Sequence, residues 1–147
     1  MKIEVIVEKE QTEKTIKIYC QEVDQTVEKI ISTLKNIDSS IIGKKDNENF
    51  VLRLEDVYYF EAVENKVFAY LEEDVFEVSY KIAELNDLLK QSSFIQTART
   101  VILNLDKIQK IKTMVNGRIL AVLNNSEKMI ITRVYANQFK NKIKGGK

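Results

Sequence analysis

The sequence of 147 residues predicts a mainly β chain of the α+β class. Apolar and polar residues alternate in many short runs rich in Val, Ile, Phe and Tyr, a pattern typical of half-buried strands. Asn116-Gly117 stands between two such runs and predicts a β-hairpin, because both residues tolerate a positive φ. Only a few short segments show the period of 3.6 residues that indicates a helix. We therefore expect antiparallel strands with a small number of short helices.

Residues 1–38 are predicted to form a strand–strand–helix leader. Residues 2–7 and 15–20 show the strand alternation, and from Glu22 onward the period becomes helical. The apolar stripe of this helix consists of Val23, Val27, Ile30, Ile31 and Leu34. A unit this small cannot bury a core alone, so the stripe is expected to pack on the rest of the chain or on a second copy.

Residues 39–147 are predicted to form a many-stranded domain after a break at Asp38-Ser39-Ser40. Strands are expected at 40–43, 49–54, 57–63, 66–71, 75–78, 94–97, 101–103, 108–114, 118–123 and 128–132. Helices are expected at 82–90, with Ser79 as a candidate cap, and at 134–143, before the terminal Gly145-Gly146. Polar turns are expected at residues 44–49, Glu64-Asn65 and 124–126.

Two features of the composition exclude large classes of chemistry. There is no histidine, and Cys20 is the single cysteine, so the usual zinc sites and the Ser-His-Asp and Cys-His catalytic arrangements are excluded. The acidic pairs Glu55-Asp56 and Glu72-Glu73 flank strands, where solvated carboxylates are the usual occupants. The sequence therefore predicts no enzyme, no metal, no cofactor and no small-molecule substrate.

The sequence also favours a cytoplasmic protein. No apolar run approaches the roughly 20 residues that cross a bilayer, and the first residues do not resemble a signal peptide. A single cysteine cannot form an intramolecular disulfide, which agrees with a reducing compartment.

Charge is distributed unevenly along the chain. Residues 1–74 carry 10 Lys/Arg and 17 Asp/Glu, a net charge of −7, whereas residues 75–147 carry 13 Lys/Arg and 5 Asp/Glu, a net charge of +8. A polyanion would be attracted to the second half, unless the two halves mix in space and the asymmetry cancels.

Three polar sites coincide with predicted strand ends or turns: Asn65-Lys66, Arg99 and Arg133. Side chains at such places can project away from a sheet. Arginine can pair with guanine or with phosphate, and asparagine can pair with adenine. Hydroxyls that can reach phosphates from nearby positions belong to Thr97, Thr100 and Thr132.

Several phrases of the second half occur together in one known family. They are Leu54–Ala62, Phe94–Leu105, Ile108–Ile111, Asn116–Arg118 and Ile130–Tyr135, and they include a Phe-x5-Ser/Thr-x3-Asn pattern and a Ser/Thr-Arg-x-Tyr ending. From about Ile42 to Ile143 the chain resembles the LytTR DNA-binding domain of bacterial transcription regulators. Its first 36 residues resemble the leader of stand-alone members that have no receiver domain.

The resemblance implies an elongated, mainly β domain whose loops and strand ends enter successive major grooves without a recognition helix. The positions that it implies for DNA contact are Asn65, Lys66, Gln96, Thr97, Arg99, Thr100, Arg133 and Tyr135. Gln96 stands where the family commonly has arginine, and Ala98 stands where a polar residue is frequent. The first departure removes a cation, which puts one phosphate contact in doubt or indicates a different operator.

The function expected from the sequence is sequence-specific binding of double-stranded DNA by a transcriptional regulator. A homodimer on promoter repeats is expected, with half-sites roughly 10 bp apart. The resemblance includes no phosphoacceptor domain, so phosphorylation is not the expected switch. Control by a membrane protein or by another protein is as plausible. The alternative is a β-rich protein–protein interaction module that does not bind nucleic acid.

Overall fold

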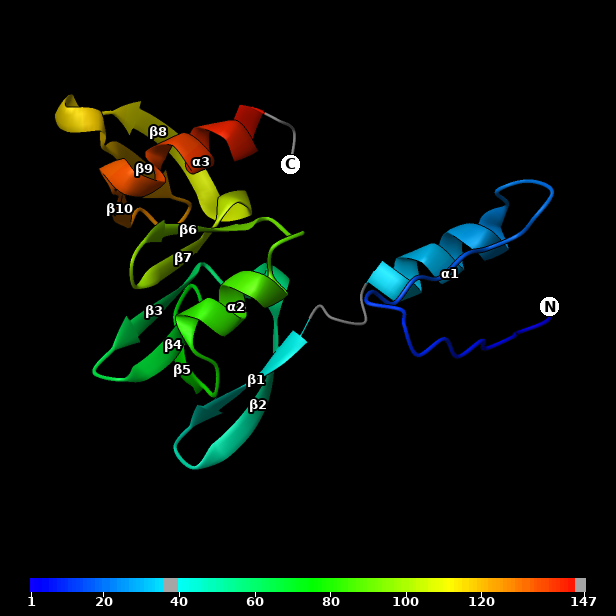
Figure 1. Ribbon diagram of the computed structural model, residues 1–147. Helices are drawn as coiled ribbons and strands as arrows, with labels where there is room; N and C mark the ends of the chain where they lie inside the picture. Colours follow the sequence, from blue (N-terminus) through cyan, green and yellow to red (C-terminus); the bar gives the residue numbers. More distant parts are fainter. Residues whose placement is uncertain (36–39, 145–147) are drawn as a thin grey trace. The chain divides into compact units, whose positions relative to one another are not determined.

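The chain folds into two compact units, residues 1–37 and 38–147, which we call the N-terminal and the C-terminal unit (Figure 1). The structure is a computed structural model, and it describes residues 1–35 and 40–144. The break predicted at Asp38-Ser39 and the terminal Gly145-Gly146 lie outside the described residues.

The N-terminal unit contains one helix, α1 (Gln25–Lys35), as the helical period predicts. Asp24 caps it, because its Oδ1 accepts a hydrogen bond of 3.0 Å from the backbone N–H of Val27. The strands predicted at 2–7 and 15–20 are wrong, since neither segment forms a strand. Most of their alternating residues are largely exposed; Val5, for example, is 85% exposed, and Ile18, at 38%, is the most covered of them. Alternation alone does not make a strand when no second strand pairs with its backbone.

The C-terminal unit consists mainly of antiparallel strands, which confirms the predicted fold class. The first sheet has the order β2-β1-β5-β4-β3-β7-β6 and the second has the order β10-β9-β8. The first is built from β1 (Ser40–Lys45), β2 (Glu48–Arg53), β3 (Tyr59–Val63), β4 (Lys66–Tyr70), β5 (Val75–Val78), β6 (Phe94–Ala98) and β7 (Val101–Asn104). The second is built from β8 (Ile108–Thr113), β9 (Ile119–Leu123) and β10 (Lys128–Ile131). Each predicted strand of this unit is present, with ends that differ by at most two residues.

Two helices accompany the sheets, α2 (Ile82–Leu88) and α3 (Arg133–Lys144). The predicted Ser79 cap of α2 is wrong, because the helix begins three residues later. The residue at its cap position is Lys81, whose backbone N–H donates a hydrogen bond of 2.8 Å to Oε1 of Glu84. Glutamate in the first turn also interacts favourably with the helix dipole.

Tight turns join the strands where the sequence predicts them. Glu64 and Asn65 have φ values of 49° and 68°, and Asn116 and Gly117 have 65° and 75°. Both pairs therefore adopt the left-handed conformation that connects antiparallel strands without disturbing their twist. The polar stretch 44–49 contains a third such turn between β1 and β2, at Asp46 and Asn47.

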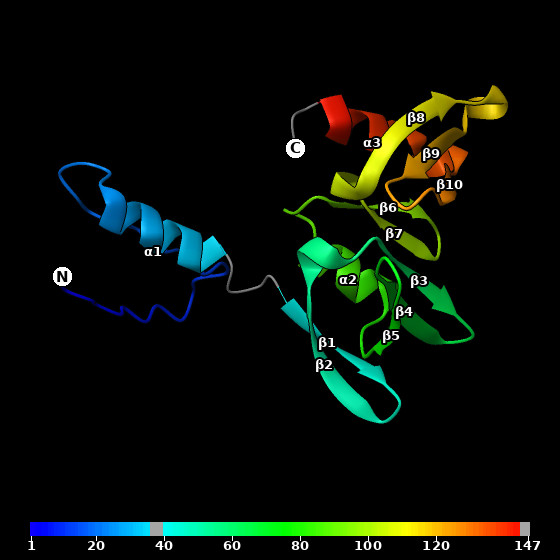
Figure 2. The ribbon, with the colours of Figure 1, turned by 180° about the vertical axis from the view of Figure 1, so that it is seen from behind.

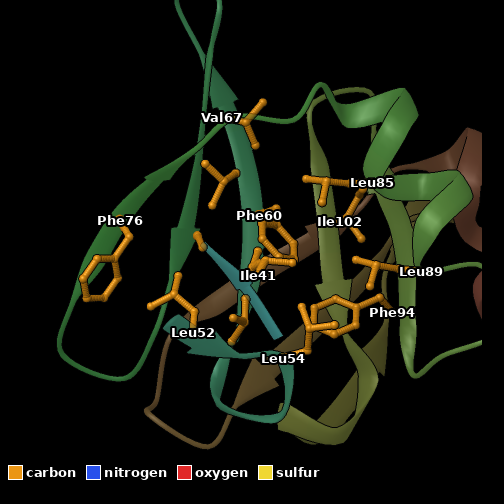
Figure 3. Close-up of a cluster of buried hydrophobic side chains, with 13 residues drawn as sticks. Ile41, Leu52, Leu54, Phe60, Val67, Phe76, Leu85, Leu89, Phe94 and Ile102 are labelled. Carbon is orange, nitrogen blue, oxygen red and sulfur yellow. The ribbon is translucent and has the colours of Figure 1, made fainter. Parts of the chain in front are cut away.

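The seven-stranded sheet takes part in two cores, one on each face. Figure 3 shows the first core, in which Leu85 and Leu89 from the α2 segment pack toward Phe60, Ile102 and Phe94. The second core lies on the opposite face of β3 and β7 and combines residues of both sheets with α3. Its buried members are Tyr58, Tyr59, Val101, Leu103, Ile119, Ala121, Leu123, Ile131, Ala136 and Phe139. All four residues of β7 are buried, because this strand has a core on each side.

Asn104 is the last residue of β7, and its side chain bonds to three other segments. Such a turn-capping role is what its position between two strands favours. Its Nδ2 donates a hydrogen bond of 2.9 Å to the carbonyl of Val57. Its Oδ1 accepts from the backbone N–H of Asp106 at 3.0 Å and from Oγ of Ser93 at 2.8 Å. Because the side chain is 1% exposed, water cannot replace these partners.

Replacing Asn104 with alanine should therefore destabilise the fold. We expect Asn104→Ala to lower the free energy of unfolding by about 1–3 kcal/mol, since it leaves buried polar groups without partners. Urea unfolding followed by circular dichroism measures the change. Asn86→Ala on the exposed side of α2 is the matched control and should change the stability by less than about 0.5 kcal/mol; an equal loss in both variants would contradict this role.

Candidate nucleic-acid interface

The turns β3–β4 and β6–β7 lie at the same end of the seven-stranded sheet. Glu61 of β3 pairs with Val101 of β7, and the backbone N–H of Ala62 donates a hydrogen bond of 2.9 Å to the carbonyl of Thr100. The β6–β7 turn, Arg99-Thr100, therefore lies beside the end of β3, and the Glu64-Asn65 turn follows directly. Both turns are on the left in Figure 1 and on the right in the reverse view of Figure 2.

The junction of β10 and α3 is held at the same end. The backbone N–H of Thr132 donates a hydrogen bond of 2.9 Å to the carbonyl of Thr97 in β6, which places Arg133 next to the β6–β7 hairpin. The other end of α3 is also fixed on β6, because Nζ of Lys142 donates to the carbonyl of Phe94 at 2.6 Å. Burial at this contact lowers the pKa of Lys142. Both ends of α3 are thus bonded to one strand.

A third turn reaches Arg133. A Cβ placed on Gly117 would lie 3.3 Å from Cγ of Arg133, so the β8–β9 turn contacts the first residue of α3. The sequence predicts this hairpin from Asn116-Gly117 but gives no indication that it joins the other turns. We call the combined region the turn-end surface. It consists of Glu64–Lys66, Arg99-Thr100, Asn116–Arg118 and Thr132-Arg133.

Most of the predicted contact residues are exposed on this surface. Asn65, Lys66, Arg99, Thr100 and Arg133 all have exposed side chains. Of the other three, Gln96 and Tyr135 lie at its margin. Gln96 is partly buried, and its Nε2 donates a hydrogen bond of 3.2 Å to the carbonyl of Arg99. Where the family commonly has an arginine, this chain therefore has an amide that is bonded within the β6–β7 turn. Tyr135 is also partly buried and packs against the second core.

Thr97 does not belong to the exposed set, which corrects the sequence-based prediction. Its side chain is 1% exposed, and Oγ1 has no hydrogen-bond partner among the residues that the structure describes. The register of β6 against β7 shifts between Gln96 and Ala98, and this bulge accompanies an inward-facing Thr97. The functional group that Thr97 provides here is its carbonyl, which accepts from Thr132.

The surface is rich in cations. Lys66, Arg99, Arg118 and Arg133 are all exposed on it, and Glu64 is its one acidic member. Nζ of Lys66 lies 3.8 Å from Oε1 of Glu77, but an exposed ion pair of this kind contributes little free energy and a phosphate can displace it. The surface can therefore attract and hold a polyanion.

In residues 1–35 and 40–144, no group of three or more Cys, Asp or Glu side chains could hold a metal ion. None of the helices in these ranges has the length and hydropathy needed to cross a membrane.

The burial of the Thr97 hydroxyl leads to a test. Thr97→Val keeps the shape of the side chain and removes the unpartnered hydroxyl, so it should raise the free energy of unfolding by about 1 kcal/mol. The affinity for DNA should not change, because the hydroxyl does not reach the surface. Urea unfolding and fluorescence anisotropy with labelled duplex measure the two quantities. Weaker DNA binding by a stably folded variant would mean that the Thr97 hydroxyl contacts DNA after all.

Comparisons with known proteins agree on one family. The LytTr DNA-binding domain matches residues 47–144. The fold is similar to the LytTr DNA-binding domain of a Bacillus cereus protein described as a methyl-accepting/DNA response regulator, with a TM-score of 0.68 and 26% identity. That match covers 71% of this chain and 96% of the solved one.

Two kinds of relative are found by sequence. An HTH-type transcriptional regulator of Staphylococcus aureus is 26% identical over 145 residues, 97% of this chain and 98% of its own length. The sensory transduction protein LytT of Enterococcus faecalis is 28% identical over 94 residues, 64% of this chain and 39% of its own length.

A helix–turn–helix is not the basis of the likeness. That motif needs two helices joined by a turn of about 3–4 residues. In the described part of this chain, strands β1–β5 separate α1 from α2, and strands β6–β10 separate α2 from α3. The family match covers the β domain, at residues 47–144, and the chain belongs to the LytTR DNA-binding domain family.

Proposed function

We propose that the chain is a transcriptional regulator that binds double-stranded DNA sequence-specifically through the turn-end surface. The observation that carries the proposal is the convergence of three turns and a helix start, with their exposed cations, at one end of the C-terminal unit. The family and the names of the relatives support the same function. They offer no support for a protein-interaction module that lacks nucleic-acid binding. The family is defined by DNA binding and not by a catalytic activity.

The dimensions of the turns suit a major groove. Neighbouring strands lie about 4.8 Å apart, so a two-residue hairpin tip is narrower than the groove, which is about 12 Å wide. Arg99 stands on such a tip and can pair with O6 and N7 of guanine, while Thr100 beside it can donate to phosphate. Lys66 and Asn65 would act from the next hairpin.

Arg133 combines two sources of positive potential. It is the first residue of α3, a helix of 12 residues whose N-terminal N–H groups carry the positive end of the helix dipole. A phosphate bound there would meet the guanidinium and the free backbone N–H groups together. The β8–β9 turn against Arg133 restricts the directions that the side chain can take.

The N-terminal unit is the proposed dimerisation element. On α1, Val27 is buried within the unit, whereas Ile30, Ile31 and Leu34 remain partly exposed. A second copy that covers this stripe would place two C-terminal units on promoter half-sites roughly one helical turn apart. A membrane protein or another protein that covers the same stripe would control the regulator by blocking the dimer. The cytoplasm, where the chromosome lies, is the expected compartment.

Removal of the two arginines should weaken DNA binding selectively. Arg99→Ala and Arg133→Ala are each expected to cost about 1–3 kcal/mol, which is about 5- to 150-fold in Kd. Fluorescence anisotropy with a duplex selected from random sequences measures the affinity, at two salt concentrations. Lys90→Ala, which removes an exposed charge from the loop between α2 and β6, is the control. An equal loss in the control, or salt-independent binding, would refute the proposed contacts.

The dimer has its own test. Ile30→Asp puts a charge into the apolar stripe of α1 and should shift the sedimentation coefficient from dimer to monomer at a concentration where the wild type is dimeric. Ser32→Asp, on an exposed position of the same helix, should leave the dimer intact. A monomeric wild type, or identical behaviour of the two variants, would argue against dimerisation through α1.

A further inference from the structure

Among residues 40–144, the second, three-stranded sheet has one face that neither core covers. Along β9, Ile119, Ala121 and Leu123 are buried in the second core, so Leu120 and Val122 point to the opposite side. The strand register adds neighbours on that side in two rows. One row is Lys110–Val122–Lys128 and the other is Lys112–Leu120–Ile130. We call these six residues the outer lysine face.

Within the C-terminal unit, α3 packs on the other side of this sheet. Its buried residues Ala136 and Phe139 belong to the second core together with Ile119 and Ile131. Figure 1 shows α3 in front of β8, and the reverse view in Figure 2 shows β8 in front of α3. The outer lysine face therefore points away from the helix.

The centre of this face is apolar, although it is turned to solvent. Ile130 is 37% exposed, and Leu120 and Val122 are partly exposed. An antiparallel sheet with one solvated face usually places polar residues there. Three aliphatic side chains that are adjacent across strands form a continuous apolar strip, and such strips on a polar surface mark sites of interaction.

The lysines around the strip have no acidic partner in the part of the chain that the structure describes. Between Lys107 and Lys144, Glu127 is the single acidic residue. Its carboxylate is engaged elsewhere, because Oε2 accepts a hydrogen bond of 2.9 Å from the hydroxyl of Tyr59. The charges of Lys110, Lys112 and Lys128 are thus available for a partner.

The spacing of the lysines fits a helix. Lys110 and Lys112 are on β8 and Lys128 is on β10, on either side of β9, so the two flanks are about 10 Å apart. An α-helix with its side chains has a diameter of about 10–12 Å. A helix that lies along β9 would place apolar residues on the central strip and carboxylates within reach of the lysines on both sides.

We propose that the outer lysine face binds an acidic amphipathic helix of a partner protein. The three lysines favour a partner with negative charge, and the apolar strip favours a protein over DNA. A duplex would satisfy the lysines with phosphates but would leave the aliphatic side chains against a charged backbone. This face is formed by one side of the three-stranded sheet and is separate from the residues of the turn-end surface.

A designed peptide tests the proposal with the full chain. The probe is a peptide of about 18 residues, about 27 Å long as a helix, with leucines on one face and glutamates on the other. Its control has the same composition in scrambled order. Fluorescence anisotropy of the labelled peptides should give saturable binding for the amphipathic one and at least about tenfold weaker binding for the scrambled one. Equal binding of both peptides would overturn the proposal.

Variants locate the site. Lys110→Glu, Lys112→Glu and Lys128→Glu combined should weaken peptide binding at least about tenfold, and Ile130→Thr should weaken it without a change in charge. The matched control combines Lys44→Glu, Lys90→Glu and Lys140→Glu, which changes the net charge equally at exposed positions elsewhere. Circular dichroism checks that each variant is folded. Unchanged peptide binding in the first variant, or the same loss in the control, would overturn the proposal.

DNA binding by the same variants shows whether the outer lysine face binds a protein helix or DNA. Because both triple variants carry the same net charge, a protein-binding face predicts equal DNA affinities for the two. A DNA affinity that is lower in the Lys110/Lys112/Lys128 variant than in the control would mean that the face holds phosphates, and would overturn the proposal.

Discussion

The C-terminal unit depends on β7, a strand with a hydrophobic core on each side. Ile102 faces the core under α2, while Val101 and Leu103 face the core shared with the second sheet. Hydrophobic burial on both faces leaves this strand little freedom to shift, because a slip of one residue would exchange the side chains of the two cores. The β6–β7 turn continues directly from the strand, so the position of Arg99 is determined by packing at a distance from it. A two-residue turn on a strand of this kind can present a side chain to DNA with little loss of conformational entropy on binding.

A second constraint connects the two sheets. The hydroxyl of Tyr59 in the first sheet donates to Glu127 beside the second, and its ring stacks on Tyr70 with centroids 4.4 Å apart. Burial and the hydrogen bond to Glu127 raise the pKa of Tyr59, so the phenol stays protonated and remains a donor. Arg133 and the β8–β9 turn belong to α3 and the second sheet, which pack onto the first sheet. The contact between the two sheets therefore also fixes the position of these residues on the turn-end surface. Glu127, the single acidic residue between Lys107 and Lys144, thus has a structural role. Because it is bonded to Tyr59, it does not pair with the lysines of the outer lysine face.

Local sequence patterns predict the strands and turns of the C-terminal unit well, because these depend on nearest neighbours. Glu64-Asn65 and Asn116-Gly117 adopt the positive φ values that their residue types permit. The pattern misleads at residues 2–7, where alternation is present but no neighbouring strand supplies hydrogen bonds. It also misleads at Thr97, because a place near the end of a strand does not show whether a side chain faces inward, and this one is 1% exposed. The contact between Gly117 and Arg133 joins two turns through tertiary packing, which short-range patterns do not contain.

The division of charge along the sequence acquires a different meaning in the folded chain. Lys66 comes from the acidic half, yet the pairing of β3 with β7 brings its hairpin beside Arg99 from the basic half. Conversely, several cations of the basic half lie on the outer lysine face and not on the turn-end surface. The excess of +8 in residues 75–147 is therefore distributed over two surfaces with different shapes. Projecting turns with little apolar area suit the grooves of a duplex, whereas a sheet face with an aliphatic centre suits a helix. Because screening limits the range of each charge to roughly 8–10 Å at physiological salt, the local geometry of each surface decides its ligand more than the total charge does.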